Sequence, residues 1–294
     1  DKNRYIGLDD IYLGEVNVYS GTYDTTDFDG EGAITSAIDY VTSDEYPQVY
    51  LLEGHGEQEL PAAFSEQIEK ENMEVNSLSL LNVDAIPEEA DCVVIYGPQS
   101  DLSQEEAAML AEYVSGGGKL LVCAGAVENG VLENLYSLLE GYGVTVHDGL
   151  VVDTDRTHYA FGYPYLLMPD LNSSPATDSL IEENYFPILP LSLGLTVGAD
   201  TGTGTVTSLL TTSDAAISKA AGYDFTTYDF EEGDAEGPFS LAVSVEDSGG
   251  GQIYWFASDQ FLNELYNAYS SGANLDMAMN ALSDLIGESE AMAI

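Results

Sequence analysis

The stretch Gln48-Val-Tyr-Leu-Leu-Glu-Gly-His-Gly-Glu57 joins an apolar run to a loop that contains two glycines. The segment after it places Leu60, Phe64 and Ile68 at the spacing of one helical face. A short continuous apolar run between turn residues is typical of a strand that is buried on both sides. The stretch therefore predicts one unit of strand, loop and helix.

Two further units of the same kind follow along the chain. The run Cys92–Tyr96 ends at Gly97-Pro98, and Ser103 with Glu106 forms a capping box that begins a helix. The run Lys119–Cys123 precedes a helix over residues 132–139. Strands that alternate with helices in this way predict an α/β fold with three layers, built on a mostly parallel sheet.

The pattern changes after residue 150 and predicts a partly antiparallel C-terminal half. Residues 240–245 and 252–257 indicate a hairpin around Ser248-Gly-Gly-Gly251, and residues 275–286 indicate a last helix. An irregular excursion is expected at about residues 155–200, because this part is rich in proline: Pro164, Pro169, Pro175, Pro187 and Pro190.

The expected organisation is an N-terminal extension over residues 1–30 and a single α/β domain over residues 31–290. The first helix of that domain is predicted over residues 31–42, where Ile34, Ile38 and Val41 recur at helical spacing. We find no internal repeat.

The charge of the chain excludes two classes of partner. The 294 residues include 6 Lys and Arg against 52 Asp and Glu, which gives a formal net charge of −46. So few cations cannot neutralise a track of phosphates, so nucleic-acid binding is excluded. Direct binding to an anionic lipid surface is excluded for the same reason. The acidity either keeps the protein soluble or attracts cations and basic partners.

No stretch approaches the roughly 18 consecutive apolar residues that a membrane span needs. No signal peptide is recognisable, and the chain begins Asp-Lys-Asn-Arg, so we expect a mature or excised segment. Two cysteines are too few for a disulfide framework or a structural zinc site. No motif for a metal or a cofactor is found, and none is expected.

The candidate binding site is the rim formed where the predicted parallel strands end, because ligands of open α/β sheets bind at that edge. Its predicted members, which would bind a partner or a ligand, are Gly54, His55, Gly56, Glu57, Tyr96, Gln99, Cys123 and Gly125. A dinucleotide fingerprint fails here because Glu59 occupies the position of its third glycine. The glycines can also serve only a tight turn, with His55 held by a carboxylate. A His/Glu pair at such a rim can instead act in acid–base chemistry or hold a metal.

Two alternative functions remain open at this point. In the first, Cys123 is the nucleophile of a hydrolase or an amidotransferase-like enzyme, which requires an exposed thiol and a histidine such as His147 or His158. A small buried hydrophobic role is the other interpretation of Cys123. In the second, alternating aromatic residues form a surface that binds a sugar or peptide: Tyr159, Phe161, Tyr163 and Tyr165.

Several segments of the chain together carry a resemblance to a known family. The most specific is Val49–Glu57, with its Gly-His-Gly-Glu loop. Others are Phe28–Ile38, Asp91–Ser103, Gly117–Val122, Gly149–Asp153, Ala257–Asp259 and Asn274–Asn280. Taken together, these segments resemble the auxiliary domain of gliding-motility-type ABC transport systems. The resemblance covers about residues 25–287, nearly the whole chain.

The resemblance implies a fold related to flavodoxin-like and glutamine-amidotransferase-like sheets, without an established catalytic site. It implies a non-enzymatic accessory domain on the extracytoplasmic face of the cell membrane, anchored by transmembrane segments outside this sequence. Its implied partners are the ABC-2-type permease and ATPase subunits of the same system. The match at residues 54–57 implies only that this loop follows the family pattern.

Overall fold

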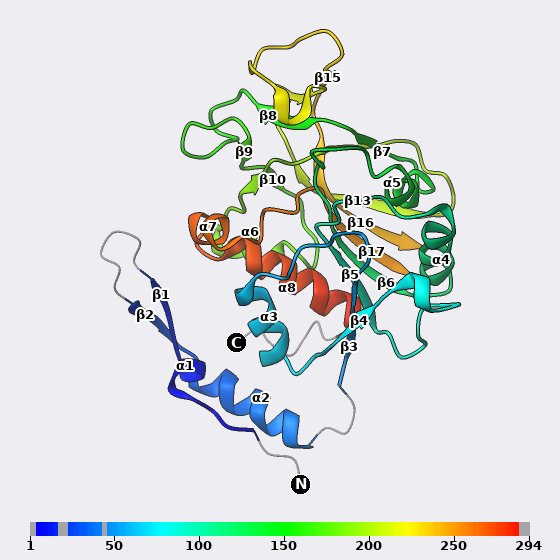
Figure 1. The fold of residues 1–294 in the computed structure, drawn as a ribbon. Coiled ribbons are helices and arrows are strands. Elements are labelled where there is room, and N and C mark those ends of the chain that lie inside the picture. The colour runs from blue at the N-terminus through cyan, green and yellow to red at the C-terminus, as the bar shows by residue number, and fades with distance from the viewer. Residues whose placement is uncertain (1–3, 17–22, 43–45, 288–294) are drawn as a thin grey trace.

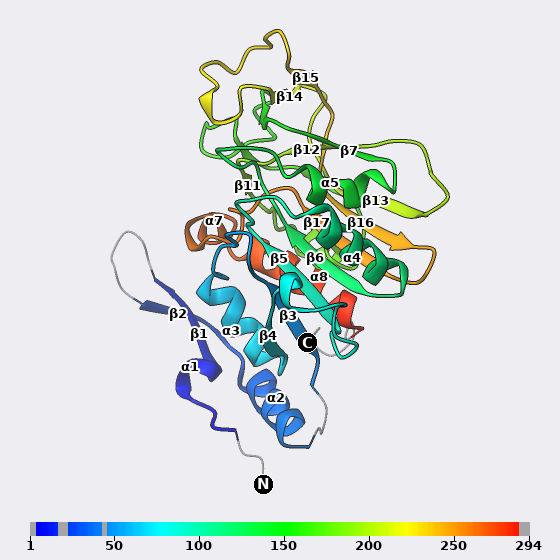
Figure 2. The same cartoon turned by 45° about the vertical axis from the view of Figure 1, so that its right-hand side comes forward.

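The computed structural model describes residues 4–16, 23–42 and 46–287, shown from two sides in Figures 1 and 2. At its centre, neighbouring strands run parallel in the order β4-β3-β5-β6-β17. Their bounds are β4 (Glu74–Leu78), β3 (Gln48–Leu52), β5 (Cys92–Tyr96), β6 (Lys119–Cys123) and β17 (Gln252–Phe256). The α/β fold with a parallel sheet is thereby confirmed.

The side chains of β5 divide between two cores, one on each face of the sheet. Cys92, Val94 and Tyr96 belong to one core, whereas Val93 and Ile95 belong to the other. Successive residues of a strand point to opposite faces, so a strand covered on both sides must be apolar throughout. The sequence of β5 is therefore an unbroken hydrophobic run.

Helices cover both faces of the parallel strands. Phe64 and Ile68 of α3 (Ala62–Lys70) and Met277 of α8 (Ala273–Ile286) pack in the first core. Helices α4 (Gln104–Ser115) and α5 (Glu133–Glu140) contribute to the second core from the opposite face. The expected capping box is present at the start of α4, where Ser103 and Glu106 bond each other's backbone amides. The three expected layers are therefore present, with the sheet between two layers of helices.

The C-terminal half extends the sheet with antiparallel strands. The expected hairpin is confirmed: β16 (Ser240–Asp247) pairs antiparallel with β17. The other strands on this side are β13 (Gly204–Thr211), β10 (Asp170–Leu171), β12 (Gly194–Val197) and β7 (Val144–His147). One strand, β17, thus joins the parallel and the antiparallel parts.

The excursion expected at residues 155–200 contains short regular elements among its loops. These are the paired β9 (Leu166–Leu167) and β11 (Leu189–Pro190), together with β10, β12 and the helix α6 (Asp178–Glu183). A separate sheet consists of β8 (Leu150–Asp153), β14 (Ala216–Lys219) and β15 (Ala235–Glu236), at the top of Figure 1. The remaining elements are η1 (Leu80–Asn82), η2 (Gly222–Asp224) and α7 (Glu264–Tyr269).

Asn274, fully buried near the start of α8, ties this excursion to the core. Its Oδ1 accepts a hydrogen bond from the Ile188 amide at 2.8 Å. Its Nδ2 donates to the carbonyl oxygens of Ile188 at 2.8 Å and Phe261 at 2.6 Å. One side chain therefore satisfies three backbone groups in two segments that are far apart in sequence.

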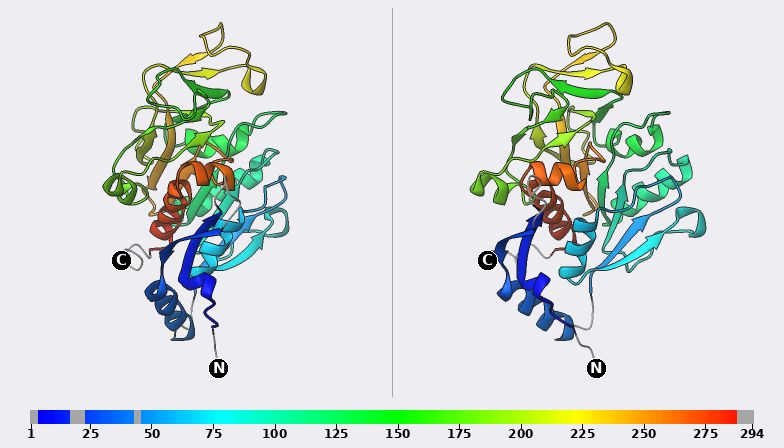
Figure 3. Two further views of the ribbon diagram at one scale, coloured as in Figure 1. Left: turned by 90° about the vertical axis from the view of Figure 1, so that its left-hand side faces the viewer. Right: turned by 60° about the vertical axis from the view of Figure 1, so that its left-hand side comes forward.

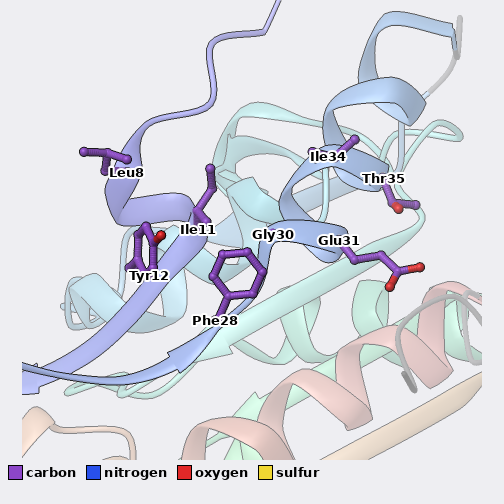
Figure 4. Close-up of a pocket in the computed structure, with 8 residues that line it drawn as sticks. All are labelled: Leu8, Ile11, Tyr12, Phe28, Gly30, Glu31, Ile34 and Thr35. Carbon is purple, nitrogen blue, oxygen red and sulfur yellow. The ribbon is translucent and has the colours of Figure 1, made fainter.

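The N-terminal elements lie at one end of the molecule, as Figure 3 shows. They are α1 (Leu8–Ile11), β1 (Tyr12–Val16), β2 (Tyr23–Phe28) and α2 (Gly30–Thr42). The predicted helix at residues 31–42 is confirmed as α2, but its Ile34, Ile38 and Val41 are exposed instead of packed in the core. A shallow apolar pocket of about 570 Å³ lies between these elements, with Phe28 and Tyr12 in its wall (Figure 4).

Candidate ligand pocket at the strand ends

The loops that follow β3, β5, β6 and β17 meet at one edge of the sheet, because these strands run parallel. The Gln99 and Ser100 amides both donate to the His55 carbonyl oxygen at 2.9 Å, which joins the loops after β5 and β3. The Gly97 amide donates to the Cys123 carbonyl oxygen at 2.8 Å, which joins β5 to β6. Gly54 and Gly56 have φ angles of 123° and 74°, which glycine adopts without the strain that a Cβ brings.

His55 lies between two carboxylates and is only 7% exposed. Its Nδ1 lies 3.1 Å from Glu57 Oε1, and its Nε2 lies 3.2 Å from Glu106 Oε2. Each ring nitrogen therefore faces one carboxylate oxygen. The predicted holding of His55 by a carboxylate is thus present, and a second carboxylate from α4 completes it.

Glu106 connects this cluster to the cap of α4. Burial raises the pKa of its carboxyl group, but the contacts with Ser103 and His55 outweigh burial and hold the pKa below its ordinary value. One oxygen, Oε2, accepts from the Ser103 amide at 2.8 Å as well as from His55. The same glutamate therefore caps the helix and contacts the His55 ring.

Replacing His55 with phenylalanine should lower the free energy of unfolding by about 2 kcal/mol, because two buried carboxylates would lose their partner. Urea unfolding at pH 7 measures the change. The matched control is His147→Phe, whose Nε2 bonds Thr196 at the surface and should cost under about 1 kcal/mol. Equal losses in the two variants would contradict the role assigned to His55.

A polar pocket of about 400 Å³ lies at the same edge, beside the His55 cluster. It is lined by Gln58, Gln99, Ala126, Val127, Glu128, Asn129, Leu191, Tyr223, Asp259 and Gln260. Pockets at the carboxyl ends of parallel strands are the usual ligand sites of open α/β sheets. This pocket is our candidate functional site.

Asp259, in the loop that follows β17, is the buried acid of the pocket and is 4% exposed. Its Oδ2 accepts a hydrogen bond from Gln58 Nε2 at 2.5 Å. Its Oδ1 is buried and has no hydrogen-bond partner among the described residues. Burial raises the pKa of this carboxyl group, and the side-chain amides of Gln260, Gln58 and Gln99 counter the rise only in part.

The predicted rim residues lie at the same edge of the sheet, but only some of them are at the pocket itself. Gln99 lines the pocket, and Gly125 lies against Asp259, since a Cβ at residue 125 would come within 2.6 Å of Asp259 Oδ1. Tyr96 and Cys123 are buried in the core beneath, and His55 and Glu57 form the cluster described above. Asp259 was missed, although it follows an apolar run just as the predicted residues do.

Tyr223, another residue that lines the pocket, belongs to a loop that Lys219 contacts. Lys219 is fully buried at the end of β14, where its Nζ donates to Asp234 Oδ2 at 2.5 Å, Glu231 Oε2 at 3.0 Å and the Asp229 carbonyl oxygen at 2.6 Å. Within this loop, the Tyr223 hydroxyl donates to the Ala126 carbonyl oxygen at 3.0 Å. Burial, with Asp259 and Glu128 nearby, raises the pKa of Tyr223 to about 12, so its hydroxyl keeps its proton.

The exposed thiol that the Cys123 alternative requires is not present, because Cys123 is fully buried. Burial, and then the nearby Asp259, raise the pKa of its thiol. Among the described residues, no histidine forms a hydrogen bond with it. These observations favour the interpretation of Cys123 as a small hydrophobic residue of the core.

We expect neither cysteine to react with a thiol reagent in the folded protein, because both are fully buried and burial raises the pKa of the Cys92 thiol to about 12. Titration with a chromogenic disulfide at pH 8 should give no rapid reaction, and two equivalents should react after unfolding in guanidinium. One fast equivalent in the native protein would restore the enzyme hypothesis.

The aromatic stripe at residues 159–165 lies apart from this pocket. Phe161 and Tyr163 are exposed, at 62% and 50%, whereas Tyr165 is half-buried. Phe161 packs on Tyr269 with ring centroids 4.6 Å apart, and Tyr163 lies 5.6 Å from Tyr165. The stripe is therefore partly a surface and partly the packing of a loop on α7.

Within the described ranges, no group of three or more His, Cys, Asp or Glu side chains is arranged to hold a metal ion. In the same part of the chain, no helix combines the length and the apolar character needed to cross a bilayer.

Fold and pocket together define an α/β protein whose candidate ligand site lies at the carboxyl ends of its parallel strands. The model of the family described as "ABC-type uncharacterized transport system" matches residues 46–249, which is more than half of the chain. The chain belongs to this family, and it is an auxiliary component of an ABC-type transport system.

Known structures are similar in fold. The chain named "mmIFT52 N-terminal domain" has 15% sequence identity and a TM-score of 0.58, and the match covers 84% of this chain and 99% of that chain. A second structure, "Exo-beta-1,4-mannosidase Op5Man5 from Opitutaceae bacterium strain TAV5", has 14% identity, a TM-score of 0.39 and coverage of 81% of this chain and 36% of that chain. No curated protein matches this sequence. At these identities the first likeness concerns the fold alone.

Proposed function

We propose that this chain is a non-enzymatic accessory domain on the extracytoplasmic face of an ABC-2-type transport system, where its pocket binds an exported ligand or a partner subunit. The observation that carries the proposal is the coincidence of family membership with a pocket at the strand ends. The pocket is lined by the buried acid Asp259 and by neutral amide side chains, and the thiol of Cys123 is fully buried in the core. Such a lining is suited to binding, and it offers no activated nucleophile.

The proposed partners are the permease and ATPase subunits of the same system, with membrane anchors that lie outside this sequence. The net charge of −46 supports the absence of direct contact with anionic lipid, because the surface would be repelled. The strand-end pocket is therefore proposed to recognise a protein or a solute instead of lipid.

The test is a pull-down from membranes of the source organism at moderate salt, with this folded domain as bait and mass spectrometry as the readout. Recovery of an ABC permease or ATPase subunit is the expected result. Two variant baits locate the contact. Gln99→Trp places a large side chain in the pocket, and Glu88→Trp places one at an exposed position before β5, at the opposite edge of the sheet.

Each outcome of the pull-down has a distinct meaning. Loss of the permease or ATPase with Gln99→Trp alone would locate a partner at the pocket. Retention with both variants would locate the partner elsewhere and leave the pocket to a ligand. Absence of both subunits from every eluate, with a bait that remains folded by circular dichroism, would overturn the proposed function.

A further inference from the structure

The pocket beside Asp259 contains side-chain oxygens that accept no hydrogen bond from the described residues. Gln58 Nε2 donates to Asp259 Oδ2 at 2.5 Å, and Gln99 Nε2 donates to the Gly97 carbonyl oxygen at 3.0 Å. In the described part of the chain, no hydrogen bond engages Oε1 of either glutamine, and Asp259 Oδ1 also has no partner. A ligand that brings hydrogen-bond donors can therefore engage these three oxygens.

The charges around the pocket select the sign of such a ligand. Two of the lining residues, Asp259 and Glu128, are acidic, and none is Lys, Arg or His. The whole chain carries a formal net charge of −46. An anion would be repelled both at the pocket and by the long-range field, whereas a cation would be attracted by both.

The desolvated carboxylate gives a second reason for a positive ligand. An ionised carboxylate that is 4% exposed and lacks a charged partner is costly to bury, and an ammonium group would offset that cost by pairing with it. A metal ion is a poorer occupant, because the described residues contain no set of three His, Cys, Asp or Glu ligands. The Tyr223 side chain in the same wall adds an aromatic ring, a group to which organic cations are attracted.

We propose that this pocket binds a small organic cation through a primary ammonium group held by Asp259 and the carbonyl oxygens of Gln58 and Gln99. The proposal rests on the proposed function, since it names the chemical class of the exported ligand. An ammonium group has three donors, one for each of these three oxygens. The cavity of about 400 Å³ accommodates a ligand of several heavy atoms.

The test compares three probes that differ in charge but are alike in size: 4-amino-1-butanol, 1,4-butanediol and 4-hydroxybutyrate. Binding is measured by titration calorimetry and by backbone amide NMR shifts of the full chain, at pH 7 and 0.15 M salt. We expect the ammonium probe to bind at least tenfold more tightly than the diol, with its largest shifts at Gln58, Gln99 and Gln260. The carboxylate probe should not bind measurably.

Matched variants separate the pocket from the acidic surface as a whole. Asp259→Asn removes the charge with little change of shape and should weaken the ammonium probe at least tenfold. Glu88→Gln makes the same change of net charge at an exposed position before β5 and should leave binding unchanged. Glu128→Gln, at an exposed position of the pocket wall, keeps the test valid if Asp259→Asn does not fold, and it should weaken binding about threefold.

Equal binding of the ammonium probe and the diol would contradict the proposal that the ligand is a cation. The pocket would then still be a ligand site. Equal weakening by Asp259→Asn and Glu88→Gln would also contradict that proposal, because the cation would then be held by surface charge. Neither result depends on whether the permease and the ATPase are recovered. The failure of this inference and the failure of the proposed function are therefore distinguishable.

Discussion

Replacing Asn274 with leucine is expected to lower the free energy of unfolding by about 4 kcal/mol, the largest effect that we predict for a single substitution. Leucine matches the size of asparagine closely but leaves the amide and carbonyl of Ile188 and the carbonyl of Phe261 without partners. Each buried backbone group left unsatisfied costs about 1–3 kcal/mol. Urea unfolding followed by the fluorescence of the buried Trp255 measures the loss.

The same helix provides the control for this prediction. Asn280 of α8 donates to Ser179 Oγ at 2.9 Å, but this contact is exposed, so water can replace it. Asn280→Leu should therefore change the free energy of unfolding by under about 1 kcal/mol. Similar losses for the two leucine variants would mean that Asn274 does not hold the excursion to the core.

Replacing Lys219 with methionine is expected to cost about 3 kcal/mol, the second largest effect. Methionine keeps the apolar stem of the side chain, but it removes the charge that Asp234 and Glu231 face. Removal of one partner of a buried ion pair leaves the other charge buried and uncompensated. The loop with Tyr223 should loosen as well, seen as faster amide hydrogen exchange over residues 220–234.

Lys119→Met is the control, since the Lys119 ammonium group donates to the Gly250 carbonyl oxygen at 3.2 Å at an exposed position. It should cost well under about 1 kcal/mol and leave exchange in the loop unchanged. If Lys219→Met costs no more than this control, the ion pair does not stabilise the loop.

The Lys219 effect should depend on pH in a defined direction. Burial raises the pKa of Asp234, but the hydrogen bonds from Lys219 and from the Ala220 and Glu231 amides outweigh it and hold the pKa below its ordinary value. A carboxyl group with a lower pKa in the folded state stabilises the fold above its unfolded pKa, and this stabilisation is lost as the pH falls. The difference between Lys219→Met and the unmodified protein should be constant from pH 6 to 8 and shrink below about pH 4. A difference that grows in acid would contradict this.

Local sequence pattern predicted the parallel units well because each carries its own signals. The strand β5 is apolar at every position since both of its faces are covered, and the Ser103 and Glu106 pair marks the start of α4 within four residues. Such features depend on neighbours in sequence, so they can be recognised without knowledge of the tertiary structure.

The missed Asp259 shows where this kind of prediction ends. The apolar run at residues 252–257 was correctly predicted as a strand and as half of a hairpin with β16. What the pattern did not reveal was its second neighbour, β6, to which it runs parallel. That long-range pairing places Asp259 at the same edge as Gln99, so the acid of the pocket is invisible to any local motif.

The helix α2 was predicted correctly from its apolar spacing, and an apolar face is usually covered in a folded domain. Ile34 and Ile38 are instead 50% and 56% exposed. Periodicity indicates that a helix has an apolar face, but it does not indicate which surface that face meets.

The position of β17 also has a consequence for how the protein is made. During synthesis β3, β4, β5 and β6 emerge long before residues 252–256, so the edge of β6 that pairs with β17 stays open until those residues have left the ribosome. An open, apolar strand edge pairs readily with other chains. A chain that stops before β17 should therefore self-associate, and completion of the sheet and assembly of the Asp259 pocket become one and the same late event.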